Sequence, residues 1–373
     1  MGCSNNCRVT IRRASLTATV TASLLFAVIA PAVPIAGAEP YAPVQPASPV
    51  APGSPVQPIN PAQDAVNVPA PQPAYTVPQG AYISKIEKID DRWEKISVWS
   101  PSMKKVIVND VYKAPRPNAP TFYLLPGMDG GENNDPGRSA DSGSTSWFGM
   151  TDIKGFFADK DVNVVSPLGG DFSWYTDWMG DPTQQYQTYM TRELIPVINK
   201  RYHTNGRNAV GGLSATGGTA VDYAIQSPGT YVAVGSYSGM LTPASNARQI
   251  QVTMLGGGQD ATKMWGPIGG PGWKAHDPSL NVARLRGTVV FVASGNGQQG
   301  AVDKLAKGSS NFGGSMIESV VSESAQKFAQ NAAAAGIPVT VVSRPEGTHT
   351  WGLFESEMQQ SYNGTIGPAL HVA

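Results

Sequence analysis

The sequence predicts an α/β fold in which a mostly parallel sheet is covered by helices on both faces. Two observations predict it. Short apolar runs bounded by turn residues indicate buried strands, and longer segments with apolar residues every three or four positions indicate helices. Because strands and helices alternate along the chain, the strands are expected to run parallel beneath two layers of helices. The expected strands span residues 121–125, 161–166, 207–213, 231–236, 287–293 and 338–343, and the expected helices span 184–202, 216–227 and 314–335.

The segment before this pattern has a different periodicity. Residues 83–112 alternate apolar and polar side chains, which is typical of antiparallel strands with one solvated face. Residues 129–145 are rich in Gly, Ser, Asp and Asn and predict a loop. We expect the folded domain to span residues 81–373.

Residues 1–38 predict a cleaved signal peptide. Arg8, Arg12 and Arg13 precede an apolar run, and small residues at positions 36 and 38 supply a cleavage pattern. A membrane anchor is the alternative, but threonines and Pro31 interrupt the run, which is short for a membrane span. Both cysteines of the chain lie before the apolar run. The mature chain is therefore expected to contain no disulfide, thiol nucleophile or cysteine metal site.

Residues 39–80 predict an extended linker. Proline occurs at every third position from Pro40 to Pro61. Polyproline II has three residues per turn, so these rings would line one face of the segment. Such a sequence cannot bury a core and is expected to act as a semi-rigid spacer, with binding through the proline face as the alternative.

The charge balance excludes one class of partner. The chain has 27 Lys and Arg, 27 Asp and Glu and a formal net charge of zero, and charged residues make up only 14% of it. No field of a single sign is available to attract nucleic acid or an anionic lipid surface. We expect no nucleic-acid partner.

Ser214 lies where an expected strand meets an expected helix, in the segment 212–218 with the sequence Gly-Leu-Ser-Ala-Thr-Gly-Gly. The small residues allow a sharp turn that lifts the serine Oγ above the sheet. This resembles the G-x-S-x-G nucleophile elbow of the α/β-hydrolase fold, with Thr216 in place of the second glycine. The helix start offers backbone N–H groups to a developing oxyanion. We expect Ser214 to be a nucleophile; a glycine-rich turn with a capping serine is the alternative.

A nucleophilic serine needs a base, and the sequence contains four histidines. His349 follows the last expected strand, where this fold places its histidine. His371 is close to the C-terminus, His203 lies on a loop that is expected at the surface, and His276 lies in a turn sequence. We expect His349 to act as the base of Ser214.

Two carboxylates remain open as the partner of His349. Asp303 comes soon after the expected strand 287–293, which is the position that the fold favours. Glu318 lies in an expected helix, where a carboxylate is usually a solvated surface charge. Either side chain could fix the histidine tautomer and stabilise the imidazolium.

Five segments carry a resemblance to a known family. They are 167–178 (Pro-Leu-Gly-Gly to Asp-Trp), 212–214 (Gly-Leu-Ser), 264–278 (Met-Trp-Gly-Pro to Asp-Pro), 295–297 (Gly-Asn-Gly) and 347–351 (Gly-Thr-His-Thr-Trp). From about residue 81 to residue 370 the chain resembles the mycolyltransferases, which include the antigen 85 proteins and their corynebacterial relatives. The elbow is generic among esterases, whereas its combination with the Met-Trp-Gly-Pro and Thr-His-Thr-Trp segments is specific.

The resemblance implies site residues and a reaction. It assigns Glu318 as the acid that completes the pair Ser214 and His349, and the backbone N–H groups of Met128 and Ala215 as oxyanion donors. It implies transfer of a mycolyl chain from trehalose monomycolate to a hydroxyl group, on a second trehalose monomycolate or on cell-wall arabinogalactan. It also implies a secreted protein of the cell envelope that needs no metal or organic cofactor.

The same resemblance separates the two candidate acids. With Glu318 as the acid, Glu318→Gln is expected to lower activity strongly. Asp303→Asn is then expected to be nearly neutral.

Two positions depart from the family pattern. Where the family carries an aspartate and an arginine that touch trehalose, this chain has Pro126 and Asp129. The loop 130–147 also differs, and the family's disulfide is absent. Asp129 offers acceptors where an arginine offers donors. We expect Asp129 to contact the donor sugar, with a solvated turn residue as the alternative. Trp351, close to His349, is expected to form an apolar wall at the acceptor site.

Two other functions remain open. A secreted esterase would use water as the acceptor, and it too would pass through an acyl-enzyme. A non-catalytic wall-binding protein could use the same fold. The joint presence of Ser214, Glu318 and His349 argues against the non-catalytic alternative.

Overall fold

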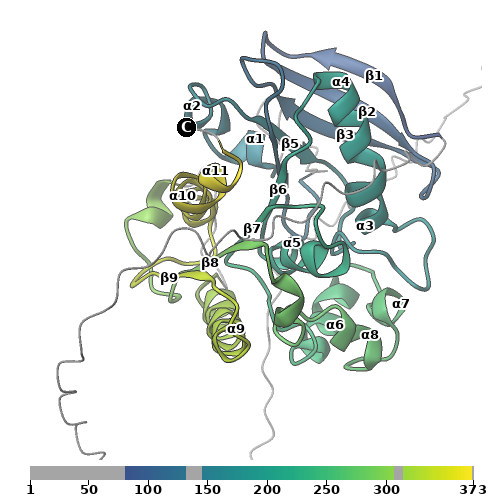
Figure 1. Ribbon diagram of the computed structural model, residues 1–373. Coiled ribbons are helices and arrows are strands. Elements are labelled where there is room, and N and C mark those ends of the chain that lie inside the picture. Colours follow the sequence, from purple (N-terminus) through teal and green to yellow (C-terminus); the bar gives the residue numbers. More distant parts are fainter. Residues whose placement is uncertain (1–79, 132–144, 306–313, 372–373) are drawn as a thin grey trace, which may run out of the picture.

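A nine-stranded sheet runs through the computed structural model, which describes residues 80–131, 145–305 and 314–371 (Figure 1). The strand order is β1-β2-β3-β5-β4-β6-β7-β8-β9. The strands are β1 (Tyr82–Lys88), β2 (Trp93–Ser100), β3 (Lys105–Tyr112), β4 (Thr121–Leu125), β5 (Asn163–Pro167), β6 (Asn208–Leu213), β7 (Ala233–Tyr237), β8 (Val289–Ser294) and β9 (Thr340–Ser343). The predicted signal peptide, and the predicted linker up to residue 79, lie outside the described residues.

The pairing of neighbouring strands changes once along the sheet, from antiparallel to parallel. β1, β2, β3 and β5 pair antiparallel, and β5, β4, β6, β7, β8 and β9 pair parallel. In β2, buried and partly exposed residues alternate, as expected for a strand with one solvated face. The predicted antiparallel start and parallel remainder are both confirmed, and each predicted parallel strand begins within two residues of the observed one.

The helices are α1 (Trp147–Met150), α2 (Ile153–Phe156), α3 (Tyr186–Thr188), α4 (Ile195–Tyr202), α5 (Ala215–Gln226), α6 (Ala247–Gly256), α7 (Thr262–Trp265), α8 (Pro271–Ala275), α9 (Gly314–Ala334), α10 (Trp351–Ser361) and α11 (Gly367–Ala369). Two π-helical segments, η1 (Tyr189–Leu194) and η4 (Tyr362–Ile366), and two 3₁₀ segments, η2 (Val282–Leu285) and η3 (Val302–Leu305), complete the described helical structure. The predicted helix 184–202 is α3, η1 and α4 in succession.

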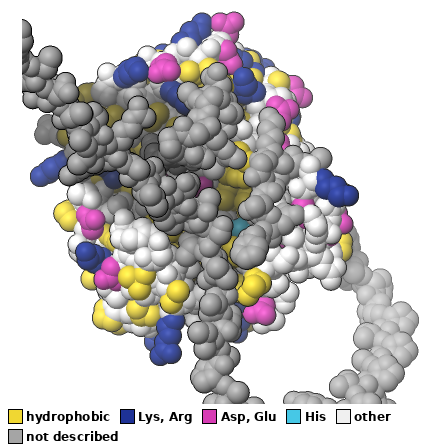
Figure 2. Space-filling model, turned by 180° about the vertical axis from the view of Figure 1, so that it is seen from behind, with side chains coloured by type: hydrophobic (Ala, Val, Ile, Leu, Met, Phe, Trp, Pro, Cys, Tyr) yellow, Lys and Arg dark blue, Asp and Glu magenta, His cyan; other side chains and the backbone are white. Residues whose placement is uncertain are grey.

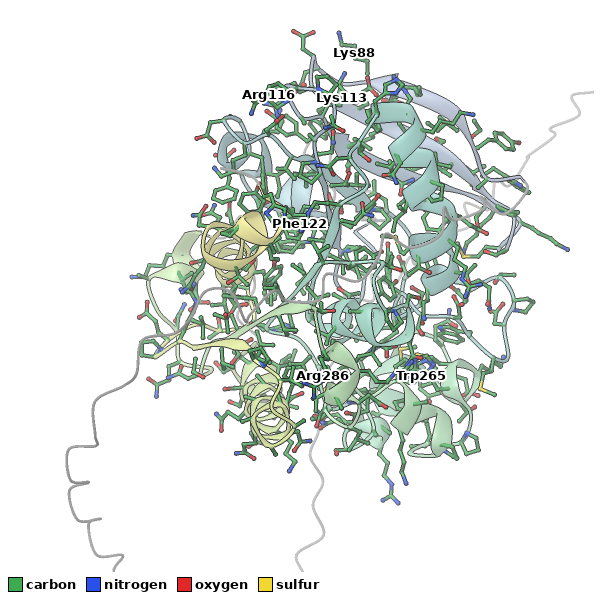
Figure 3. All side chains as sticks on the ribbon, viewed as in Figure 1. Lys88, Lys113, Arg116, Phe122, Trp265 and Arg286 are labelled. Carbon is green, nitrogen blue, oxygen red and sulfur yellow. The ribbon has the colours of Figure 1, made fainter. Side chains whose placement is uncertain are left out.

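Two hydrophobic cores lie on opposite faces of the sheet. In β4, Tyr123 and Leu125 pack into the core beneath α4, α5 and α9, whereas Phe122 and Leu124 pack into the core beneath α1, α2 and α10. Side chains alternate between the faces because successive Cβ atoms of a strand point in opposite directions. Phe122 lies near the middle of the molecule (Figure 3). The predicted two-sided covering of the sheet is confirmed (Figure 1).

A third hydrophobic cluster joins the short helices α6 to α8 to the start of α5. Trp265 and Trp273 meet edge to face, with ring centroids 5.2 Å apart, and Trp265 lies among these helices in Figure 3. Ala215, the first residue of α5, packs into the same cluster. The Met-Trp-Gly-Pro segment of the sequence therefore builds a subdomain beside the elbow.

Charges of both signs intermingle on the surface. On the face shown in Figure 2, where grey atoms do not cover it, Lys and Arg lie among Asp and Glu instead of forming a patch of one sign. Along the described part of the chain, every helix is too short or too polar to cross a membrane.

Candidate active site

Ser214 lies at the sharp turn between β6 and α5. Its backbone has φ 55° and ψ −122°, and a positive φ is strained for a residue other than glycine. Two glycines leave room for the turn. A Cβ on Gly212 would lie 2.2 Å from the carbonyl oxygen of Thr216, and one on Gly218 would lie 1.9 Å from that of Met240. The predicted turn is confirmed, and its strand–turn–helix geometry is that of a nucleophile elbow.

Thr216 occupies the position that departs from the G-x-S-x-G pattern. Its Oγ1 accepts a hydrogen bond from the N–H of Leu213 at 3.2 Å and donates to the carbonyl oxygen of Pro126 at 2.7 Å. The threonine therefore ties the elbow to the end of the neighbouring strand β4, a contact that a glycine could not make.

Three side chains from distant parts of the sequence meet beside this turn. Ser214 Oγ lies 2.8 Å from His349 Nε2, and His349 Nδ1 lies 2.8 Å from Glu318 Oε2. His349 is placed by the loop between β9 and α10, and Glu318 by the beginning of α9. Ser214 makes no capping hydrogen bond to α5, so the structure does not support the alternative interpretation of a capping serine.

The environment of Glu318 suits a carboxylate that accepts hydrogen bonds only. Its side chain is 0% exposed and that of His349 is 10% exposed. While Oε2 faces His349, Oε1 accepts hydrogen bonds from Ser238 Oγ at 2.7 Å and from the N–H of Gly295 at 2.6 Å. These donors satisfy a buried charge that would otherwise be costly. They also fix the carboxylate so that one oxygen points at the histidine.

The other three histidines lie away from Ser214. His203 is exposed at the end of α4 and His371 is exposed after α11. His276 Nδ1 lies 2.7 Å from Asp222 Oδ2, and its ring stacks on Trp265 with a centroid distance of 4.9 Å. All four histidines are among the described residues, and only His349 contacts Ser214.

Asp303, the alternative acid, does not contact the His349 ring but holds the residues on either side of it. Its Oδ1 accepts hydrogen bonds from the N–H of Thr348 at 2.9 Å, from Thr348 Oγ1 at 2.8 Å and from Thr350 Oγ1 at 2.9 Å. Its Oδ2 accepts from the N–H of Gly300 at 2.8 Å. Burial acts to raise the pKa of Asp303, but the hydrogen bonds from Gly300, Thr348 and Thr350 outweigh it and lower the pKa below its usual value.

These contacts revise the expectation that Asp303→Asn is nearly neutral. Asparagine has one oxygen, so either Gly300 or the threonines would face an amide N–H₂ group. Losing hydrogen bonds to a charged group shifts the His349 loop, and we expect kcat on an ester substrate to fall about tenfold. Asp260, which accepts hydrogen bonds from Thr262 in the same way at a remote site, provides the matched control. Equal kcat values for Asp303→Asn and Asp260→Asn would remove Asp303 from this role.

The two predicted oxyanion donors lie at the same edge of the sheet as Ser214. Met128 follows β4 and Ala215 begins α5, and β4 pairs with β6 up to the partners Leu125 and Gly212. The N–H of Met128 makes no hydrogen bond to any described residue. The N–H of Ala215 belongs to the first turn of a helix, where intrahelical partners are lacking. Both residues pack into the cluster that α6 to α8 form.

Trp351 and Asp129 are the two predicted substrate contacts. Trp351 is half-buried and packs edge to face against Trp147 and Phe354, with centroid distances of 5.5 Å and 5.8 Å. Phe354 in turn packs edge to face against the His349 ring at 4.8 Å. Asp129 is exposed as a residue, but neighbouring atoms bury its carboxyl group and raise its pKa above the usual value. Its Oδ1 accepts a hydrogen bond from the N–H of Gly131 at 3.3 Å.

Two residues of this site were missed from the sequence. Ser238 follows β7 and donates to Glu318. Glu357 lies on α10 and is 0% exposed. No helix was predicted for residues 351–361, and Glu357 has polar neighbours there, so its local sequence is typical of an exposed glutamate. The available signal was its spacing from Leu353, Phe354 and Ser361, which are buried on the same helix and share its face at intervals of three and four.

A serine at a strand–turn–helix elbow, hydrogen-bonded to a histidine that contacts a buried carboxylate, belongs to the serine-nucleophile class of the α/β-hydrolase fold. A family model described as "Putative esterase" matches residues 100–364. The diacylglycerol acyltransferase/mycolyltransferase Ag85A of Mycobacterium leprae is 33% identical over 274 residues, which cover 69% of this chain and 78% of the relative. Ag85B of Mycolicibacterium smegmatis is 30% identical over 283 residues, or 71% and 82% of the two chains. The chain belongs to the Ag85 mycolyltransferase family of esterase-related proteins and is an acyltransferase.

Solved structures support the fold. MPT51 (FbpC1) of Mycobacterium tuberculosis has a TM-score of 0.63 with 23% identity and covers 76% of this chain and 99% of its own. FphF, a fluorophosphonate-binding serine hydrolase of Staphylococcus aureus, has a TM-score of 0.57 with 11% identity and covers 74% and 98%. The predicted α/β-hydrolase fold and the resemblance to the mycolyltransferases are confirmed.

Proposed function

We propose that the protein transfers a mycolyl chain from trehalose monomycolate to a hydroxyl acceptor through an acyl-enzyme on Ser214. The observation that carries this proposal is the pair of 2.8 Å contacts that link Ser214, His349 and Glu318. Membership of the Ag85 family supports the mycolyl donor. The acceptor is a second trehalose monomycolate, arabinogalactan or another envelope hydroxyl, which agrees with the secretion that residues 1–38 predict.

The first half of the reaction forms the acyl-enzyme. Ser214 Oγ attacks the ester carbonyl carbon of the donor while His349 Nε2 accepts the hydroxyl proton. Glu318 stabilises the imidazolium and holds its Nδ1–H. The N–H groups of Met128 and Ala215 donate hydrogen bonds to the oxyanion. As the tetrahedral intermediate collapses, His349 gives the proton to the departing trehalose oxygen.

The second half transfers the acyl chain. The acceptor hydroxyl loses its proton to His349 as its oxygen attacks the acyl-enzyme carbonyl. The new ester forms when the bond to Ser214 Oγ breaks, and the proton returns to this oxygen. Ser214 is regenerated, and one ester has been exchanged for another.

Product analysis tests this function against hydrolysis, which the esterase family match favours. Purified protein is mixed with trehalose monomycolate, and the lipids are identified by mass spectrometry. We expect trehalose dimycolate and free trehalose. Free mycolic acid as the sole acyl product would instead indicate a hydrolase. A serine-directed phosphonate separates both from a non-catalytic protein, because only an activated Ser214 reacts with it.

We propose that Trp351 shields the acyl-enzyme from water. Water is present at about 55 M, so transfer requires that water be excluded or the acceptor be bound in place. Trp351→Ala removes a large ring two residues from His349 and is expected to raise the ratio of free acid to transferred product. Trp351→Phe, which keeps an aromatic surface, is the control. The ratio is independent of the amount of folded protein, and an unchanged ratio would exclude this role.

We propose that Asp129 contacts the donor sugar. Asp129 is an exposed residue that follows β4, at the same edge of the sheet as Ser214, and its side chain can accept hydrogen bonds from sugar hydroxyls. Asp129→Ala is expected to lose activity on trehalose monomycolate while retaining activity on a nitrophenyl ester. If the variant matches the parent on both substrates, Asp129 is a turn residue with no contact to the sugar.

A further inference from the structure

Two buried carboxyl groups meet at one serine hydroxyl behind His349. Glu318 from α9 and Glu357 from α10 are each 0% exposed. Ser238 Oγ lies 2.7 Å from Glu318 Oε1 and 3.3 Å and 3.4 Å from the two oxygens of Glu357. The reaction described above uses Glu318 but leaves Glu357 without a role.

Counting protons assigns the state of Glu357. A serine hydroxyl has a single hydrogen, and the shorter contact places it on the line to Glu318. A hydrogen bond between Ser238 and Glu357 then requires that Glu357 supply the hydrogen. Two carboxylates in one buried site repel each other, so one of them keeps its proton. Burial, followed by the charge of Glu318, raises the pKa of Glu357 well above its usual value.

We propose that Glu357 is a positioning residue that acts on Glu318 through Ser238. Neutral Glu357 donates a hydrogen bond to Ser238 Oγ, and Ser238 donates to Glu318 Oε1. With Oε1 held in this way, Oε2 is directed at His349 Nδ1. This inference rests on the proposed role of Ser214, His349 and Glu318, and it extends their series of hydrogen bonds by two members, Ser238 and Glu357.

The charges around Glu357 determine how activity depends on pH. Glu318 opposes its ionisation, whereas Arg344, which follows β9, favours it. Tyr237 of β7 and His349 are the other titratable groups near this cluster. The neutral form exists below the raised pKa and is lost as pH rises through it. Ionised Glu357 would compete for the Ser238 hydrogen and place a second negative charge beside Glu318, so the rate falls at high pH.

Substitutions at Glu357 test this role. Glu357→Leu removes the donor and is expected to lower kcat on a nitrophenyl ester about tenfold, as the loss of one hydrogen bond to a charged network predicts. KM should change little, because Glu357 does not reach the substrate. Glu357→Gln keeps a donor that cannot ionise, and is expected to restore the kcat lost in the leucine variant and to abolish the fall of kcat at high pH. If the dependence of kcat on pH is the same in the parent and in Glu357→Gln, the proposal is overturned.

The effect of Glu357→Leu in a Ser238→Ala variant distinguishes positioning through Ser238 from a general structural role of Glu357. In Ser238→Ala the relay atom is missing, so adding Glu357→Leu should cause no further loss of kcat. A full additional loss would show that Glu357 acts by another route. Glu323→Gln, an exposed glutamate on α9, should behave as the parent. Phosphonate labelling of the parent distinguishes a failure of the proposed function from a failure of this inference. A parent that does not react with the phosphonate refutes the proposed function. A parent that reacts, together with Glu357 variants whose kcat equals that of the parent, refutes only this inference.

Discussion

Ser214→Ala is expected to lower kcat/KM on ester and glycolipid substrates by several orders of magnitude. Its Oγ is the atom that His349 Nε2 reaches at 2.8 Å, and alanine leaves the base with no nucleophile to activate. Loss of a nucleophile that acts together with its base typically lowers the rate by several orders of magnitude. The measurement is the initial rate of nitrophenyl ester cleavage.

The matched control for this prediction is Ser227→Ala. Ser227 follows the other end of the same helix α5, so it tests a serine-to-alanine change that does not touch His349. The control should retain the parental rate. Comparable rates in Ser214→Ala and the parent would eliminate Ser214 as the nucleophile.

Glu318→Gln is expected to reduce kcat roughly a thousandfold or more, as losses of a triad acid do. Glu318 accepts hydrogen bonds from Ser238, Gly295 and His349. A glutamine has one oxygen for these donors, so its N–H₂ group must face at least one of them. If it faces His349, the histidine is held in the wrong tautomer.

The control for Glu318 lies on the same helix. Glu323→Gln changes an exposed carboxylate of α9 and should leave kcat unchanged. A larger loss of kcat in Asp303→Asn than in Glu318→Gln would identify Asp303, the carboxylate at the position that the fold favours, as the acid. The two sets of rates therefore decide between the carboxylates that the sequence left open.

Most of the fold was predictable because its strands are short apolar runs with clear boundaries. The elbow was predictable for a local reason as well, since Gly212 and Gly218 must be small where the backbone of Thr216 and Met240 approaches. The short helices α7 and α8 were not predicted, because four and five residues are too few to show a helical period.

The acid could not be chosen from the sequence by physical reasoning alone. Asp303 and Glu318 both follow β8, and which one reaches His349 depends on how α9 packs against the sheet. The burial of Glu357 was hidden for the same reason, because the face that α10 presents depends on its packing. Resemblance to a family supplied Glu318, and the geometry agrees with that choice. The hydrogen bonds from Thr348 and Thr350 to Asp303 join residues about 45 positions apart, so the sequence could not predict them.

Intact-mass spectrometry of the protein during turnover, followed by peptide mapping, tests whether an acyl-enzyme forms on Ser214. With trehalose monomycolate as donor, we expect a population that is heavier by one mycolyl group, with the added mass on the peptide that contains Ser214. Addition of excess trehalose should discharge this adduct and regenerate trehalose monomycolate. Turnover with the acyl group on another residue, or an adduct that persists in Ser214→Ala, would exclude Ser214 as the nucleophile.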